Sequence, residues 1–362
     1  MTTPLAPSNF IELAEAVRSH ARVLAIGAGT KPRLSKAGSD VTLLSTRALR
    51  GIIEYEPDEF TFTAQAGTPV SEIAAALAER GQYLPFDPMW LEAGATLGGA
   101  IAAGVSGPGR FRFGGVRDFI LGIRFVDGQG RLLRMGGKVV KNAAGFDLPK
   151  FFVGSLGRFG VLTEATFKVF PWPAARVTLK LPTQGIDAAA QVLIDAARSR
   201  WEPEALDLLP DGLTVCLRLA GPASALAAVA SEILARWPGH TLSSAEAETV
   251  WFEVREFRWA HPDGVLVKVA VTPGVLPSLM VATRSVAGVR VHVSAGGNVA
   301  FISFPAGAHT TAFQEQLRGL GLSGVELRGE GPLWWGARPH RKIDGAVKEA
   351  LDPQHRFPSL ED

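Results

Sequence analysis

The run AGATLGGAIAAGVSGPGRFRFGG, Ala93 to Gly115, is the part of the sequence that decides the fold. It holds eight glycines and no acidic residue. Each glycine costs extra backbone entropy on folding, so this density is typical of a chain that approaches another group closely or adopts positive φ repeatedly. The run therefore predicts that backbone lies against a large anionic ligand.

The first half of this run has the features of a helix start. Thr96 stands before Leu97–Ala103, which is predicted to form a short helix with Thr96 as its N-cap. The free N–H groups and the positive dipole at such a start favour a phosphate group. Three later glycines would let a flat ring or a ribose lie against the backbone: Gly104, Gly107 and Gly109.

A second glycine-rich loop, Gly27 to Lys31, lies between strands predicted at residues 23–26 and 41–44. A Rossmann fingerprint requires G-x-G-x-x-G at the start of a helix, whereas here no helix is predicted and Pro32 takes the last position. Consecutive N–H groups can still bind a phosphate, although for this loop alone an ordinary tight turn is the stronger interpretation. Together, the two glycine loops favour a dinucleotide over a mononucleotide.

Composition excludes several classes of partner. The net charge is +2, so no basic surface for nucleic acid or an anionic membrane is indicated. Hydrophobic residues make up 47% of the chain, enough for large cores and a buried subunit interface. Neither a signal peptide nor a membrane span is predicted, which favours a cytoplasmic location and leaves membrane association through a complex open.

Cysteine and histidine usage narrows the chemistry. The single cysteine, Cys216, lies in the apolar stretch LTVCLRLA and is predicted to be a buried strand residue. One thiol excludes internal disulfides and a cysteine-ligated iron–sulfur cluster within this chain. The seven histidines show no metal-ligand spacing, so no metal site is predicted.

The chain is predicted to be an α+β protein of two domains. Pro171-Trp172-Pro173 marks the boundary, so residues 1–175 form the first domain and residues 176–329 the second. Helices and strands in the second domain predict an antiparallel sheet with helices on one face. Residues 330–362 are expected to pack back on the first domain.

Local signals predict two features of the first domain. Asn9, followed by Glu12, is predicted to cap a helix with Leu13 and Val17 on its apolar face. The sequence DGQG at 127–130 predicts the turn of a hairpin.

Several motifs, in order and at consistent spacing, resemble the FAD-binding domain of the vanillyl-alcohol oxidase or PCMH type. They include LAIGAGTK at 24–31, FTFTAQAGTPVSEI at 60–73 and the glycine run. More narrowly, GGKVVKNAAGFDLPKFFVGSLGRFGVLTE at 136–164 resembles the FAD-binding subunits of bacterial glycolate oxidases. The resemblance covers residues 20–175 and implies a PCMH-type domain of two α/β subdomains, followed by an antiparallel-sheet cap domain.

The resemblance also implies which residues contact FAD. They are Ile26, Gly27, Ala28, Gly29, Thr30, Lys31, Thr96, Leu97, Gly98, Gly99, Ser106, Gly107, Gly114, Asp118, Gly160 and Val161. Lys141 would lie near the isoalloxazine ring. For Asp118 and Lys141, a structural ion pair or cap is an equally good interpretation.

Two departures from the family pattern matter. Covalent flavinylation in this fold uses a histidine or cysteine near the glycine loops, and residues 24–35 and 94–116 contain neither, so FAD is predicted to bind non-covalently. Hydroxy-acid dehydrogenases of this fold carry an H-x-G-x-G-N-x-H motif. Its nearest match begins at His292, is off by one in spacing and ends in Ala300, so a sheet residue explains His292 at least as well as a base.

The resemblance implies FAD-dependent oxidation of glycolate or a related 2-hydroxy acid such as D-lactate. His261 and His292 are the candidate bases. Arginine suits a carboxylate because its fork is bidentate. The candidate cations for the substrate carboxylate are Arg255, Arg258, Arg338 and Lys141.

Electron transfer from a flavin to a quinone chain requires one-electron carriers that this chain lacks. The resemblance supplies a larger FAD-binding catalytic subunit and an iron–sulfur subunit as partners. Two alternatives remain open. The chain could bind FAD for structure or electron relay while the larger subunit does the chemistry, or it could be a stand-alone flavin oxidoreductase of the same fold.

Overall fold

The computed structural model of the chain describes residues 3–137, 147–338 and 342–360. Contacts divide the chain into two units, each with its own sheets and hydrophobic core. The first unit consists of Met1–Ser106, Gly114–Pro171 and His340–Asp362. The second consists of Gly107–Phe113 and Trp172–Pro339.

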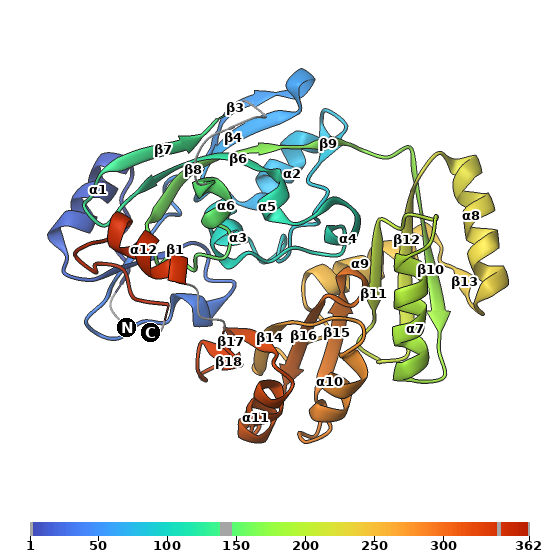
Figure 1. Cartoon of the computed structure of the whole chain (residues 1–362). Coiled ribbons are helices and arrows are strands. Elements are labelled where there is room, and N and C mark those ends of the chain that lie inside the picture. Colours follow the sequence, from blue (N-terminus) through green and yellow to red (C-terminus); the bar gives the residue numbers. More distant parts are fainter. Residues whose placement is uncertain (1–2, 138–146, 339–341, 361–362) are drawn as a thin grey trace. The chain divides into compact units, whose positions relative to one another are not determined.

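Within the described residues, the first unit contains three sheets (Figure 1). Strands β1 and β2 pair in parallel, β3-β4-β8-β6-β7 form an antiparallel sheet, and β5 pairs with β9. The strands are β1 (Val23–Ile26), β2 (Thr42–Ser45), β3 (Ile52–Glu56), β4 (Thr61–Gln65), β5 (Gln82–Tyr83), β6 (Ile120–Val126), β7 (Leu132–Gly136), β8 (Val161–Lys168) and β9 (Phe170–Pro171). The helices are α1 (Phe10–Ser19), α2 (Val70–Ala78), α3 (Leu97–Ala103), α5 (Val116–Phe119), α6 (Leu148–Phe151) and α12 (Lys342–Leu351), with 3-10 turns η1 (Pro32–Ser35) and η2 (Pro57–Glu59).

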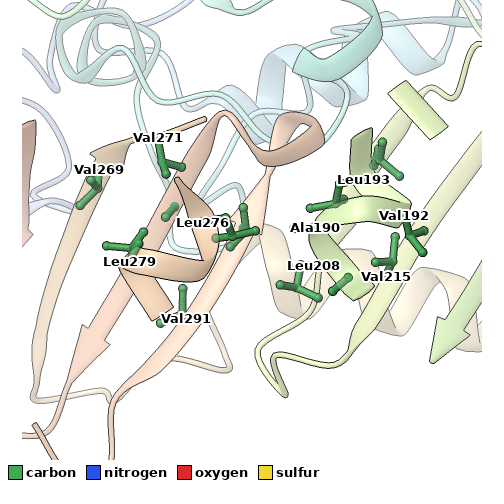
Figure 2. Close-up of a cluster of buried hydrophobic side chains, with 14 of the residues drawn as sticks. Ala190, Val192, Leu193, Leu208, Val215, Val269, Val271, Leu276, Leu279 and Val291 are labelled. Carbon is green, nitrogen blue, oxygen red and sulfur yellow. The ribbon is translucent and has the colours of Figure 1, made fainter. Parts of the chain in front are cut away.

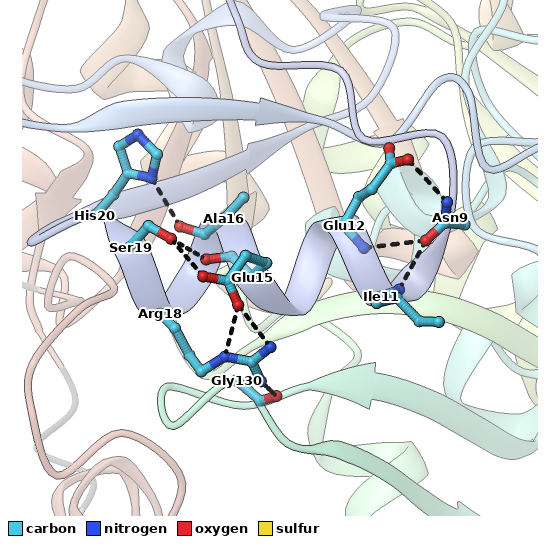
Figure 3. Close-up of polar contacts among 9 residues, drawn as sticks. All are labelled: Asn9, Ile11, Glu12, Glu15, Ala16, Arg18, Ser19, His20 and Gly130. Atoms are coloured by element: carbon cyan, nitrogen blue, oxygen red, sulfur yellow. Dashed lines mark hydrogen bonds and ion pairs between the residues drawn. The ribbon is translucent and has the colours of Figure 1, made fainter.

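Helix α1 begins where the sequence predicts it (Figure 3). The side chain of Asn9 accepts hydrogen bonds from the backbone N–H groups of Ile11 and Glu12, each at 3.0 Å, which confirms the predicted N-cap. Leu13 and Val17 are buried on its inner face. Arg18 donates to the carbonyl of Gly130 at 2.9 Å, which ties α1 to the turn after β6.

The predicted hairpin is confirmed as β6 and β7. The Asp127 carboxylate accepts the backbone N–H groups of Gln129 and Arg131, which stabilises the turn between the strands. Helices α3 and α6 pack against β8 and β6, and Figure 1 shows both helices on one side of the five-stranded sheet.

The second unit is built on one nine-stranded sheet with the order β13-β10-β12-β11-β15-β16-β14-β17-β18. All of its strand pairs are antiparallel, as the sequence predicts. Its strands are β10 (Ala175–Pro182), β11 (Ala205–Leu208), β12 (Thr214–Gly221), β13 (His240–Thr241), β14 (Val265–Ala270), β15 (Arg290–Ser294), β16 (Val299–Phe304), β17 (Ser323–Arg328) and β18 (Trp334–Gly336). Its helices are α4 (Arg110–Phe113), α7 (Ile186–Ala197), α8 (Ala223–Arg236), α9 (Ser244–Arg255), α10 (Leu276–Thr283) and α11 (Thr311–Gly319), with the 3-10 turn η3 (Ala295–Gly297).

One face of this sheet carries the main core of the second unit (Figure 2). Leu193 of α7 and Leu279 of α10 pack there with strand residues such as Val215 and Val291. Helices α8 and α11 add side chains to the same core, which agrees with the predicted layer of helices on one face.

Helix α9 is an exception to that layer. Cys216 of β12 points to the opposite face from its neighbours Val215 and Leu217, because side chains alternate along a strand. There it packs with Trp251 of α9 in a separate cluster. The Trp251 indole N–H donates to the Thr178 hydroxyl at 3.0 Å, so its one polar group is satisfied.

Candidate cofactor site

A pocket in the first unit lies where the two glycine loops meet. It encloses about 690 Å³ of space, open solvent at its mouth included. Its walls come from residues 25–35, 96–103 and 155–162, together with Thr46 and Ala66.

The first glycine loop presents unpaired donors to this pocket. The backbone N–H groups of residues 27–31 make no hydrogen bond to any residue that the structure describes. Gly29 has φ of +74°, a conformation that favours glycine and turns the loop sharply. The prediction that no helix follows this loop needs correction, because the 3-10 turn η1 begins at Pro32. A row of N–H donors of this kind can cradle an anionic oxygen group.

The two loops touch each other, which is why glycine is required at their contact. A Cβ placed on Gly27 would lie 2.3 Å from Thr96 Oγ1 of the second loop. A Cβ on Gly98 would lie 2.9 Å from the side chain of Ala66, which follows β4. Thr96 is the N-cap of α3, as predicted, and accepts the N–H of Gly99. Any side chain at residue 27 would therefore displace the cap of the second loop.

Lys31 is the one ionisable side chain among the residues described as lining the pocket. It is only 7% exposed. Its Nζ donates to the Thr30 hydroxyl at 2.9 Å and lies 4.7 Å from the centre of the Trp90 ring. Burial lowers the pKa of Lys31 from 10.5 to about 8, because a low-dielectric environment disfavours the ammonium form.

The family comparison agrees with this geometry. Residues 8–136 match the family model described as "FAD binding domain". This part of the chain is an FAD binding domain. Its pocket fits the cofactor, because glycine-backed N–H donors and a lone cation suit the diphosphate of FAD.

Three named relatives each match less than half of the chain. The glycolate oxidase subunit GlcE of Escherichia coli is 46% identical over 154 residues, which cover 42% of this chain and 44% of that protein. The glycolate oxidase subunit GlcD of Bacillus subtilis is 34% identical over 167 residues, 46% of this chain and 35% of that protein. A D-2-hydroxyglutarate dehydrogenase of Xanthomonas citri is 29% identical, over 48% of this chain and 37% of that protein. The matches thus span less than half the length of these relatives.

Solved structures extend the likeness to the whole fold. Two structures of alkyldihydroxyacetonephosphate synthase superpose with TM-scores of 0.75 and 0.71, each at 17% sequence identity. They cover 100% and 97% of this chain and 78% and 75% of those chains. The α+β class and the PCMH-type fold expected from the sequence are confirmed.

Nine of the predicted cofactor residues line the pocket of the FAD-binding domain. They are Gly27, Ala28, Gly29, Thr30, Lys31, Thr96, Gly98, Gly99 and Gly160. Sequence reasoning missed several others, including Ser35, Thr46, Ala66 and Ser155. Ser155 precedes Gly157 in the GSLGRFG segment, so that glycine-rich signal could have identified it. Thr46 and Ala66 carry no such local signal.

The other seven predicted cofactor residues do not line this pocket. Ile26 ends β1 beside it, Leu97 is a buried residue of α3, and Val161 is buried in β8. The Ser106 hydroxyl accepts the N–H of Val116.

Three of those seven lie around α5 or outside the first unit. Asp118 caps α5 by accepting the N–H of Gly115, the structural role that was the alternative for it. A Cβ on Gly114 would lie 2.4 Å from the Asp118 carboxylate, so this glycine serves the cap. Gly107 belongs to the second unit.

Three of the four predicted catalytic residues lie among the described residues, and each contacts another part of the protein. His292 is fully buried; its Nε2 lies 2.9 Å from Asp207 Oδ2, so it is a core residue of β15 with no surface that a substrate could touch. His261 Nε2 contacts the Gly288 carbonyl at 2.8 Å, and Arg255 Nε donates to the Trp251 carbonyl. Lys141 lies outside the described residues.

Among the described residues, no helix is long and apolar enough to cross a membrane. Over the same residues, no group of three or more His, Cys, Asp or Glu side chains is arranged to hold a metal ion.

Proposed function

We propose that this chain is the FAD-binding subunit of an oxidoreductase complex that oxidises glycolate or a related 2-hydroxy acid such as D-lactate. The observation that carries the proposal is the 46% identity to the glycolate oxidase subunit GlcE across 154 residues. Further similarity to a second glycolate oxidase subunit and to 2-hydroxy-acid dehydrogenases supports the same substrate class.

The pocket would hold FAD without a covalent bond. The N–H groups of Gly27 to Lys31 and the capped start of α3 would bind the diphosphate. Gly157 and Gly160 leave room for the ring or ribose to approach the backbone at the third wall. Among the described residues, no histidine or cysteine lines this pocket, so no lining side chain described offers the usual attachment point for flavin.

The bound FAD would supply the hydride-accepting chemistry, and the protein would supply binding and orientation. Electrons would then pass to an iron–sulfur subunit, because Cys216 is the single cysteine and is buried. A larger FAD-binding subunit would complete the complex. Arg255 and His261 stay predictions for contacts to the hydroxy acid.

The burial of His292 favours one alternative. A candidate base whose side chain is fully buried and bonded to Asp207 cannot take a proton from a substrate. The chain would then hold FAD for structure or electron relay, and the larger subunit would oxidise the acid.

Anaerobic titration separates these two possibilities. The purified chain should be yellow, and denaturation should release free FAD, because attachment is non-covalent. Glycolate or D-lactate should then bleach the flavin absorbance, first in the isolated chain and then in the chain co-purified with its partners. Bleaching only in the complex indicates the relay role, and a colourless chain that takes up no added FAD refutes the proposal. Bleaching by NADPH but by neither acid would instead indicate the stand-alone oxidoreductase.

A further inference from the structure

Lys31 is a buried cation without an anionic partner. Its side chain is 7% exposed and forms no ion pair within the described part of the chain. Its contacts are a neutral hydroxyl, Thr30 Oγ1 at 2.9 Å, and the ring of Trp90 at 4.7 Å. A cation over an aromatic ring gains some energy, but far less than the loss of hydration costs.

The charged groups on the surrounding elements do not compensate it. Arg33 follows it in η1, and Asp87 and Glu92 flank the segment of Trp90. Burial is nevertheless the one resolved cause of the lowered pKa of Lys31. Buried charges in proteins are normally paired, so a lone buried ammonium indicates that its counter-ion comes with a ligand.

The position of Lys31 points to the phosphate part of that ligand. It belongs to the loop whose N–H groups at 27–31 have no acceptor among the described residues, and it lines the same pocket. Main-chain donors and a lysine of the same loop, which line one pocket, together can form an anion site.

We propose that Lys31 is the counter-ion of the FAD diphosphate, and that FAD binding therefore draws a proton from solution onto the Lys31 amine at alkaline pH. The proposal rests on the proposed FAD site and adds the electrostatic role of one residue. The neutral amine gains one proton from the buffer and becomes the ammonium that pairs with the phosphate oxygens.

The direction of the pH dependence follows from linkage. In the free protein the pKa of Lys31 is about 8, and an adjacent diphosphate raises it because an anion favours the ammonium. FAD affinity should therefore be nearly constant below about pH 7 and fall by up to ~10-fold per pH unit above about pH 8.

Calorimetric titration of the FAD-free chain with FAD tests this directly. Buffers of different ionisation enthalpy report the number of protons taken up, at about pH 7 and about pH 9. The wild type should take up little at the lower pH and approach one proton at the higher pH. Lys31→Met should take up none, and its affinity loss should be ~10–100-fold at the lower pH and much smaller at the higher pH.

Two further variants keep the result interpretable. Lys31→Arg retains a cation at both pH values, so it should bind FAD without proton uptake, even if Lys31→Met does not fold. Lys36→Met removes an exposed ammonium five residues away and should behave as wild type. Proton uptake by Lys31→Met equal to wild type, or an equal affinity loss at both pH values, would overturn the inference and leave the FAD site standing. A wild type that binds no FAD would instead overturn the proposed function.

Discussion

Replacing Lys31 with methionine should stabilise the FAD-free protein near neutral pH, although it weakens the proposed cofactor site. The fold lowers the pKa of Lys31 from 10.5 to about 8. At about 1.4 kcal/mol per pH unit, holding the buried ammonium costs the native state about 3 kcal/mol. Methionine has a similar shape and no charge, so it removes this cost.

The strongest test of this burial cost is how the stability gain of Lys31→Met changes with pH. Because the folded pKa lies below the unfolded pKa, the unfolded chain binds more protons between the two values, and stability rises with pH there. The full cost is present below about pH 7.5, shrinks between about pH 8 and pH 10.5, and vanishes above that range. The gain from Lys31→Met should thus fall from about 3 kcal/mol at about pH 7 to about 1 kcal/mol at about pH 9.5.

Urea denaturation of the FAD-free chain at both pH values measures this gain. Unfolding is monitored by circular dichroism, so that the signal does not depend on Trp90 fluorescence. Lys36→Met is the matched control, because its ammonium is exposed and no burial cost is relieved. A gain for Lys31→Met that is the same at both pH values would show that methionine acts only through packing, and the electrostatic reasoning would be wrong. A loss of stability at about pH 7 would contradict the burial cost itself.

Three further predictions concern other sites. Gly27→Ala places a Cβ 2.3 Å from Thr96 Oγ1, so FAD affinity in a flavin fluorescence titration should fall at least ~10-fold and α3 should lose about 1 kcal/mol of capping energy. A Cβ on Gly185 would have no atom within 4 Å, so Gly185→Ala should change neither the affinity nor the capping energy. Asp207→Ala removes the acceptor of His292, Ser294 and the Ala295 N–H; urea denaturation should show a loss of about 3 kcal/mol, against a few tenths for the exposed Asp187→Ala. Burial raises the pKa of Cys216, so a thiol reagent should label it only as fast as the second unit unfolds; rapid labelling of the native chain would contradict its buried place beside Trp251.

Local chemistry is what could be predicted from the sequence. The caps of α1 and α3 and the hairpin turn at Asp127 were predicted, because each depends on a few consecutive residues. The short strands β11 and β18 were missed, because their pairing partners lie far along the chain.

The candidate cofactor site was also predictable only in part. A site of close backbone approach without acidic residues could be predicted from the glycines at 27–31 and 93–115, because glycine spacing and the absence of carboxylates are properties of the sequence itself. It could not be predicted that Thr46 and Ala66 complete the pocket, because pairing of the strands that precede them, β2 with β1 and β4 with β8, brings them there.

Tertiary structure alone decided the roles of the charged candidates. His292 reads as a possible base in the sequence, but sheet packing buries it completely against Asp207. Lys31 is predicted from the sequence as one of several FAD contacts, but only folding buries its amine among neutral groups and leaves it without an ion pair in the described structure. Burial and the distance to a counter-charge depend on residues far apart in the chain, and they determine whether a titratable group is inert or suited to a ligand.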